Sequence, residues 1–282
     1  GELTMGRAPS PWATSIKYEE KDLKIVGGNP SERADAADKV TGKARYTADY
    51  NLPGQLIGKV LRSPHAHANI RSIDTSAAEA MTGVKAVVTC ADFPDMAVEH
   101  AASGELMVNF RDVTRNLMAR EKVYYDGHPV AAVAATSEAI ALRALKLIKV
   151  DYEVLPHVID VVEAMKPDAP VLHDDQFTKG VEPAPDKPSN IALRMESKLG
   201  DVEEGFNQAD LIIEREFNTK PSHQGYIEPQ ASVATYTDGG HAEIWTSTQG
   251  HFVMRAQVAK LLQMDVSKVK VTAPELGGGF GG

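Results

Sequence analysis

The stretch Gly277-Gly278-Gly279-Phe280-Gly281-Gly282 follows the apolar alternation of Val269 and Val271. Glycine loses the most backbone freedom on folding and has no side chain to pack, so this stretch predicts a loop. Without Cβ atoms, such a loop can bring several backbone N–H groups close to an anionic or polar ligand. Composition alone is equally typical of a flexible linker, but a linker rarely carries a large aromatic residue at its centre. We therefore expect a ligand-binding loop at the end of a strand.

Working outward, the residues before the loop predict a strand–helix–strand unit, over 241–248, 252–264 and 269–272. Gln249 comes between the first strand and the helix, where a neutral amide can donate a hydrogen bond to a ligand oxygen. In such a unit both strand ends emerge at the same edge of the sheet. We therefore expect Gln249 and the glycine loop to form one concave site. Its neutral donors would suit a large anionic cofactor with metal-bound oxygens.

The rest of the pattern predicts an α+β fold. Residues 1–36 are polar and turn-rich, which indicates an extended N-terminal arm. Residues 37–155 mix strands and helices as one α+β domain, with the weakly patterned residues 95–120 as an ordered surface excursion. The expected strands cover 55–61, 68–73, 84–89, 123–125, 129–135 and 149–155, and the expected helices cover 77–81 and 137–148.

A proline-rich linker and a second body complete the chain. Six prolines make residues 156–190 stiff and extended. The second body, over 191–282, adds a short helix near 200–206 and strands over 211–217 and 231–236 to the strand–helix–strand unit. His223 and Glu228 have a spacing that a metal pair could use, but no third ligand is near them. A structural polar loop is the preferred interpretation of that stretch.

Composition narrows the function classes. The 282 residues are 43% hydrophobic and carry a formal net charge of −9 without a visible basic patch, which argues against nucleic acid as a partner. The single cysteine, Cys90, excludes an internal disulfide and a cysteine-built iron–sulfur cluster within this chain. This favours a reducing compartment, so we expect a cytoplasmic location, with the periplasm as the alternative. No run of about 18 apolar residues predicts a membrane span.

Six motifs, taken together, resemble the molybdopterin-binding large subunit of the molybdenum hydroxylases, the family of xanthine dehydrogenase and aldehyde oxidase. The resemblance covers residues 37–282 and follows the family's order. The motifs are Asp38-Lys39-Val40-Thr41-Gly42-Lys43-Ala44-Arg45-Tyr46, Arg62-Ser63-Pro64-His65-Ala66-His67-Ala68, Asp126-Gly127-His128-Pro129-Val130-Ala131, Ile227-Glu228-Pro229-Gln230, Thr248-Gln249 and the terminal glycine loop.

The resemblance implies an α/β hammerhead domain over 37–155 and the first, incomplete part of a molybdopterin-binding domain over 191–282. Gln249 matches a glutamine that hydrogen-bonds a molybdenum oxo ligand, and the backbone of Phe280 matches a group that faces the metal. Six residues are implied to be cofactor-binding: Gln249, Gly250, Gly278, Gly279, Phe280 and Gly281.

The resemblance also implies cofactors and partners. The family oxidises a substrate with water as the oxygen source and passes the electrons to iron–sulfur clusters and flavin. We therefore expect molybdenum–molybdopterin here, with its cytosine dinucleotide form as the usual bacterial variant, and 2Fe–2S and FAD in partner subunits. An N-heteroaromatic compound or an aldehyde is the expected small-molecule substrate.

The chain departs from the family in one respect. Family large subunits continue for several hundred residues past the glycine loop, and that part holds the general base. Glu228 and Glu275 match no base, so we expect no catalytic residue here and no turnover by this chain without the remaining part of the molybdopterin subunit. That part would be either a separate chain or the rest of a longer one.

Two other functions compete with the enzyme subunit. A module that binds phosphate or a nucleotide could use the same loop, but no Lys-Ser/Thr pair follows the glycines and the helix precedes them. A non-catalytic assembly subunit could use the hammerhead as a docking surface for a flavin or iron–sulfur partner. Metal and pterin analysis of the native complex would separate the three.

Overall fold

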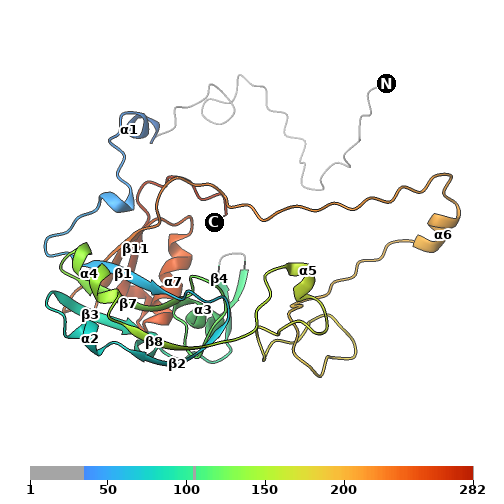
Figure 1. Ribbon diagram of the computed structural model, residues 1–282. Coiled ribbons are helices and arrows are strands. Elements are labelled where there is room, and N and C mark those ends of the chain that lie inside the picture. Colours follow the sequence, from blue (N-terminus) through green and yellow to red (C-terminus); the bar gives the residue numbers. More distant parts are fainter. Residues whose placement is uncertain (1–34, 104–105, 282) are drawn as a thin grey trace, which may run out of the picture. The chain divides into compact units, whose positions relative to one another are not determined.

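The computed structural model describes residues 35–103 and 106–281, and it divides the chain into two compact units, Gly1–Tyr46 and Thr47–Gly282 (Figure 1). The predicted arm over 1–36 lies almost wholly outside the described residues. In the first unit the described part holds one short helix, α1 (Ala36–Val40). An ion pair of 2.7 Å between Lys39 and Asp35 spans one turn of this helix.

The second unit begins with an antiparallel sheet of strand order β1-β7-β3, with bounds Ile57–Arg62, Pro129–Ala135 and Val84–Thr89. The central strand β7 is the run of alanine and valine that predicted a buried strand, and Ala131, Val133 and Ala135 are buried. Its small side chains pack with Ala78 of helix α2 (Ser76–Glu79) and with Ala141 and Ala144 of helix α4 (Glu138–Leu145). The first core of the domain is therefore built from small apolar residues.

A second antiparallel sheet has the order β6-β2-β8, with bounds Lys122–Val123, Ala68–Asp74 and Lys149–Val154. Its buried residues Ala68 and Val123 form a cluster with Ala119 and with Val130 of β7. Short 3-10 turns occur before β1 and after β3, at Thr47–Asp49 and Cys90–Asp92. The strands and helices of this mixed body agree with the α+β fold that the sequence predicted.

The stretch from residue 95 to 120, expected to be a weakly patterned excursion, contributes to the core. It contains a hairpin of β4 (His100–Ser103) and β5 (Leu106–Asn109), followed by helix α3 (Phe110–Leu117). Asn109 caps the helix by accepting a hydrogen bond from the Arg111 N–H. Phe110 and Met118 are buried. The stretch is ordered, as expected, but its placement as a surface excursion was wrong, because the strands are short and the buried positions are few.

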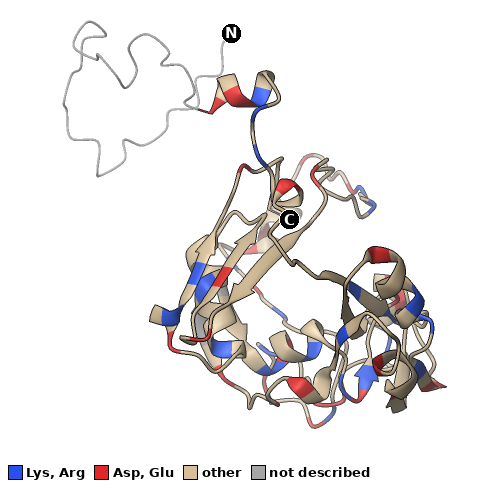
Figure 2. Cartoon of the chain, turned by 90° about the vertical axis from the view of Figure 1, so that its left-hand side faces the viewer, with Lys and Arg blue, Asp and Glu red and all other residues tan. Residues whose placement is uncertain are grey.

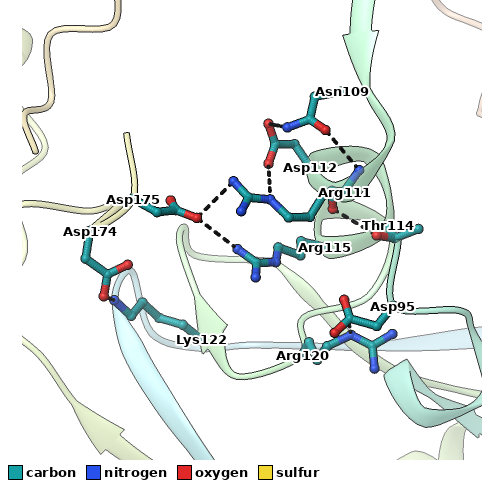
Figure 3. A network of polar contacts seen from close by, with 10 residues as sticks. All are labelled: Asp95, Asn109, Arg111, Asp112, Thr114, Arg115, Arg120, Lys122, Asp174 and Asp175. Atoms are coloured by element: carbon teal, nitrogen blue, oxygen red, sulfur yellow. Dashed lines mark hydrogen bonds and ion pairs between the residues drawn. The ribbon is translucent and has the colours of Figure 1, made fainter. Parts of the chain in front are cut away.

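The proline-rich segment is attached to α3 and β6 by ion pairs (Figure 3). Arg111 Nη2 lies 2.9 Å from Asp175 Oδ2, Arg115 Nη1 lies 3.6 Å from the same oxygen, and Lys122 contacts Asp174 at 3.3 Å. His173 stacks on the ring of Tyr124 with centroids 4.4 Å apart. Helix α5 (Val161–Ala164) and a parallel bridge between Lys179 and Leu193 are the regular structure of this segment. The segment is therefore held in place by polar contacts at discrete points.

The expected strand over 211–217 is absent from the structure. After helix α6 (Val202–Asn207), the chain up to β9 has neither helix nor strand (Figure 1). Leu211, Ile213 and Phe217 are exposed, and no backbone N–H of residues 211–217 donates to another described residue. The alternation of apolar and polar residues is that of a strand, but a strand forms only when a neighbouring strand pairs with it.

The last sheet has the strand order β11-β10-β9 and positions the glycine loop. Strand β9 (Ser232–Tyr236) forms an antiparallel hairpin with β10 (Ala242–Thr246), and β10 runs parallel to β11 (Val269–Thr272). Helix α7 (His251–Leu261) connects the parallel pair, followed by a 3-10 turn over Val266–Lys268. Ala259 of α7 packs on Val269 and Val271 of β11. This is the predicted strand–helix–strand unit.

Charged residues are dispersed over the described part of the chain. Figure 2 shows Lys and Arg interspersed with Asp and Glu on helices, strands and loops, without a concentrated basic face in that view. Several of the basic residues are paired with carboxylates, as Lys59 is with Glu138 and Lys270 with Glu243. None of the described helices is both long and apolar enough to cross a bilayer.

Candidate functional site

Three segments converge at the ends of β10 and β11. They are the loop before β9, the turn between β10 and α7, and the glycine loop after β11. Together they line a small cleft of about 30 Å³, formed by Tyr226, Glu228, Gln230, Ser247, Thr248, Gln249, Leu276, Gly278 and Gly279. A space of that size admits about one water-sized group. Only a single polar group of a larger ligand could therefore enter the cleft.

Gln249 and the glycine loop are in direct contact. Gly279 is buried, and a Cβ atom built on it would lie 2.5 Å from both Cδ and Nε2 of the Gln249 side chain. No side chain larger than hydrogen fits between the loop backbone and the amide. The convergence expected from the parallel strand pair is thus present, and it depends on glycine at residue 279.

The turn that carries Gln249 is fixed by hydroxyl groups. Thr246, buried at the end of β10, shares a 2.7 Å hydrogen bond with the Ser232 hydroxyl and donates to the Ala231 carbonyl at 3.3 Å. The Gly250 N–H donates to the Thr248 hydroxyl oxygen at 3.1 Å. These contacts tie the end of β10 to its hairpin partner, so Gln249 projects from a braced turn.

Gly250 lies beside the cleft, at the start of helix α7. It is the N-cap residue of α7, and no side chain caps the helix. Free N–H groups at a helix N-terminus favour negative charge nearby. This end of α7 follows Gln249 directly in the chain and adds to the neutral donors at the sheet edge.

The glycine loop has a second anchor in Glu228. The Gly277 N–H donates to Glu228 Oε2 at 2.6 Å, and a Cβ atom at residue 277 would lie 2.5 Å from the Glu228 Cβ. Gly278 adopts φ +108°, a conformation that L side chains rarely take, and packs near Tyr226. Gly277 and Gly278 thus contact the loop before β9, and Gly279 contacts Gln249.

Phe280 and Gly281 lie outside the cleft. Phe280 has a positive φ of 54° and is 73% exposed, and its ring lies against Gly278. Gly281 has φ +86° with open space where a Cβ would be. A left-handed conformation at a bulky residue is strained and persists where the surroundings require it. This turn therefore presents the Phe280 ring outward from the loop.

The structure brings together three of the six residues that the resemblance implied, Gln249, Gly278 and Gly279, in one cleft. The contributions of Tyr226, Glu228 and Gln230 were missed by sequence reasoning, which interpreted their stretch as a structural polar loop. The signal was present, because Ile227-Glu228-Pro229-Gln230 is one of the six motifs. What the sequence does not contain is the contact of Glu228 with a glycine 49 residues later.

The donor set fits a large, oxygen-rich ligand better than a metal ion bound by side chains. Among the described residues no three His, Cys, Asp or Glu side chains are grouped for metal binding. The available groups are the Gln249 amide, backbone N–H groups of a loop that a Cβ would obstruct, and the N-terminus of α7. Glu228 Oε1 is buried without a hydrogen-bond partner in the described part of the chain. A ligand that brings its own metal and both donor and acceptor atoms would fit this arrangement.

Comparisons with known proteins agree with this arrangement. The profile of the aldehyde oxidase and xanthine dehydrogenase a/b hammerhead domain matches residues 41–156, and that of the molybdopterin cofactor-binding domain matches residues 183–282. A probable hypoxanthine oxidase, XdhD, of Escherichia coli K12 is 37% identical, and the match covers 99% of this chain and 32% of that protein. The nicotinate dehydrogenase large molybdopterin subunit of Eubacterium barkeri is 32% identical, and the match covers 93% of this chain and 56% of that subunit.

A solved structure gives the same result. Quinoline 2-oxidoreductase from Pseudomonas putida 86 superposes with a TM-score of 0.75 at 29% identity, over 89% of this chain and 30% of that one. The chain spans about a third of the length of the first curated relatives that it matches. The fold, the motif order and these matches show that the chain belongs to the molybdenum hydroxylase family, with a hammerhead domain and a molybdopterin cofactor-binding region like those of the family's large subunits.

Proposed function

We propose that this chain contributes to the molybdopterin site of an oxidoreductase that oxidises an N-heteroaromatic compound or an aldehyde with water as the oxygen source. The observation that carries the proposal is the contact between Gln249 and Gly279 at the edge of the parallel strands. Names of relatives support the substrate class, since hypoxanthine, nicotinate and quinoline are all N-heteroaromatic. The family description, which includes aldehyde oxidase, supports the alternative.

The residues of the chain have distinct roles in this proposal. The Gln249 amide would donate a hydrogen bond to an oxygen of the metal centre, and the backbone of Gly278 and Gly279 would contact the pterin. The exposed Phe280 ring would form part of the wall that a flat substrate meets. A bound molybdenum pyranopterin would supply the two-electron chemistry and the activation of water that the described side chains do not offer.

The proposal includes partners. Electrons would pass to 2Fe–2S and FAD groups in partner chains, and the rest of the molybdopterin subunit would supply the general base. The shorter nicotinate dehydrogenase relative, of which this chain spans 56%, supports an arrangement in which the molybdopterin subunit is itself divided. We propose a cytoplasmic location and the cytosine dinucleotide form of the pterin, and neither changes the roles of the residues above.

The test is to purify the native assembly that contains the complete polypeptide and to measure its metal and pterin content. We expect about one molybdenum per polypeptide, a fluorescent pterin after oxidative release, and copurifying chains that carry iron and flavin. A folded assembly that lacks molybdenum and pterin would overturn the proposal. Iron and flavin without molybdenum would indicate instead the docking role considered above, and bound phosphate or nucleotide alone would indicate a simple binding module.

A further inference from the structure

Glu228 makes the contact that connects the loop before β9 to the glycine loop. Its Oε2 accepts the Gly277 N–H at 2.6 Å, a distance typical of a strong bond to a charged acceptor. The contact is partly buried and joins residues 49 apart in sequence. Gly277 begins the glycine run, five residues after β11 ends at Thr272, so this bond fixes the start of that run.

Packing around Glu228 leaves little freedom for another arrangement. The position that a Cβ would take at Gly277 lies 2.5 Å from Glu228 Cβ, 3.2 Å from Oε2 and 3.4 Å from Cγ. Two residues away, the Gln230 amide donates to the Tyr226 hydroxyl at 2.8 Å, which braces the turn that carries Glu228. The side chain therefore meets the Gly277 backbone along its whole length.

The second observation concerns the other carboxylate oxygen of Glu228. Glu228 Oε1 is buried and has no hydrogen-bond partner among the described residues, although Glu228 lines the same cleft as Gln249 and Gly278. A buried acceptor is usually paired, so an unpaired one in a cleft indicates that a donor arrives with another group. One oxygen of Glu228 thus holds the loop, and the other is available to what binds beside it.

We propose that Glu228 is a positioning residue of the cofactor site. By fixing the Gly277 N–H, it sets the path of Gly278 and Gly279 and keeps Gly279 against the Gln249 amide. The role of Glu228 at a cofactor site rests on the proposed function. Its hydrogen bond to the Gly277 N–H lies within this chain and can be tested by itself. Glu228 is not assigned a proton-transfer role, because its Oε2 is already committed to a backbone N–H.

Two conservative variants test the tether. Glu228→Gln keeps the length of the side chain and an oxygen that can accept the Gly277 N–H. Glu228→Asp keeps the charge but is one methylene shorter, so its oxygens cannot reach the same N–H. Glu214→Asp is the matched control, because it makes the same substitution at an exposed residue of the extended segment before β9.

Hydrogen–deuterium exchange of the peptide over 275–281, in the complete polypeptide as purified, is the measurement. We expect Glu228→Asp to speed exchange of the loop amides about tenfold, as for loss of a hydrogen bond to a charged acceptor. Glu228→Gln should stay within about threefold of the unchanged protein, and Glu214→Asp should match it. Equal exchange in Glu228→Asp and Glu228→Gln would overturn the proposal. So would faster exchange spread evenly over β9–β11, which would indicate general loosening of the sheet.

Molybdenum content of the same samples separates this proposal from the proposed function. Where the unchanged assembly contains molybdenum, we expect Glu228→Asp to lose most of it. Glu228→Gln should lose less, because it keeps the oxygen that accepts the Gly277 N–H but replaces the other oxygen with an NH2 group. Full molybdenum in Glu228→Asp, despite a loosened loop, would overturn the role of Glu228 in positioning. An unchanged assembly without molybdenum would refute the proposed function, while the exchange data would still decide whether Glu228 holds the loop.

Discussion

Gly279 lies directly against the side-chain amide of Gln249, with 2.5 Å between the position of an added Cβ and the amide carbon. The contact joins two of the three segments of the candidate site, the turn after β10 and the loop after β11. A larger residue would meet Cδ and Nε2 at 2.5 Å and Cγ at 2.9 Å, all of them atoms of the flexible Gln249 side chain. A substitution at residue 279 would therefore displace the amide before it disrupted the fold.

This contact predicts that Gly279→Ala and Gln249→Ala are not additive. Gly279→Ala should cost less than about 1.5 kcal/mol of unfolding free energy, because the Gln249 amide can move aside. Turnover by the native assembly should nevertheless fall at least about tenfold in either single variant, as expected when a preorganised donor is lost. The double variant should be no worse than Gln249→Ala, because that change removes the colliding atoms. Turnover losses that multiply in the double variant would contradict this coupling.

Gly83 is predicted to be required for stability of the hammerhead domain. It follows α2 with φ +94°, and a Cβ there would lie 2.6 Å from Ile140 Cδ1 and 3.0 Å from Thr136 Oγ1. Gly83→Ala should lower the unfolding free energy by about 1–3 kcal/mol, from backbone strain and the clash with α4. Chemical denaturation is the measurement. Gly58→Ala on β1, where a Cβ meets open space, is the control and should change stability by less than about 0.5 kcal/mol.

His128 is predicted to make the domain less stable in mild acid. Its ring is fully buried, Nδ1 accepts the Tyr124 N–H at 3.3 Å, and Nε2 therefore donates to the Arg115 carbonyl at 2.9 Å. Burial lowers the pKa of His128 below its ordinary value of 6.5. The unfolded chain then binds more protons than the folded one once the pH falls through about 6.5, so stability decreases from there downward until the folded-state pKa is reached.

The variant His128→Gln isolates this contribution. It should be about 1–3 kcal/mol less stable at pH 7.5, because one ring hydrogen bond is lost. The decrease in stability between pH 6.5 and 5 should be smaller than in the unchanged protein. Burial also lowers the pKa of His173, so part of the decrease should remain. Identical slopes of unfolding free energy against pH in the two proteins would refute the assignment to His128.

We predict that the ion pairs between the proline-rich segment and α3 contribute little to the free energy of unfolding, although they hold the segment at a defined position. Asp175 pairs with both Arg111 and Arg115, and the carboxylate is 38% exposed (Figure 3). Asp175→Asn should therefore cost less than about 1 kcal/mol. Limited proteolysis should cut the segment over 176–190 several times faster, since its anchor is loosened. Glu163→Gln, which removes only an exposed pair with Lys166, should leave the cutting rate unchanged.

Local sequence patterns predicted the longer strands and helices, whose periodicity is clear in the sequence. The run over 129–135 is apolar throughout and became the central strand β7, and Ser137 caps α4 by accepting the Ile140 N–H. The parallel pair β10 and β11 placed Gln249 and the glycine loop at one edge, because the connecting helix constrains both strand ends. These features depend on the periodicity of apolar residues and on the length of the connection between two strands, and both can be read directly from the sequence.

The errors occur where structure depends on distant contacts. The alternation over 211–217 predicted a strand, but it pairs with no strand in the described part of the chain. The hairpin β4–β5 escaped notice because four-residue strands give little periodicity. Glu228 was interpreted as part of a polar loop, since nothing in its neighbours indicates that it accepts the Gly277 N–H. Long-range pairing of this kind has no local signature.

The uncovered stretch over 211–217 has a practical consequence for handling the protein. Its exposed Leu211, Ile213 and Phe217 alternate along an extended backbone whose N–H groups have no partner among the described residues. Such a template attracts other copies of the same chain, and self-association would grow with concentration. We therefore expect production of these 282 residues in isolation to yield aggregates, and coexpression with the partner chains proposed above to reduce them.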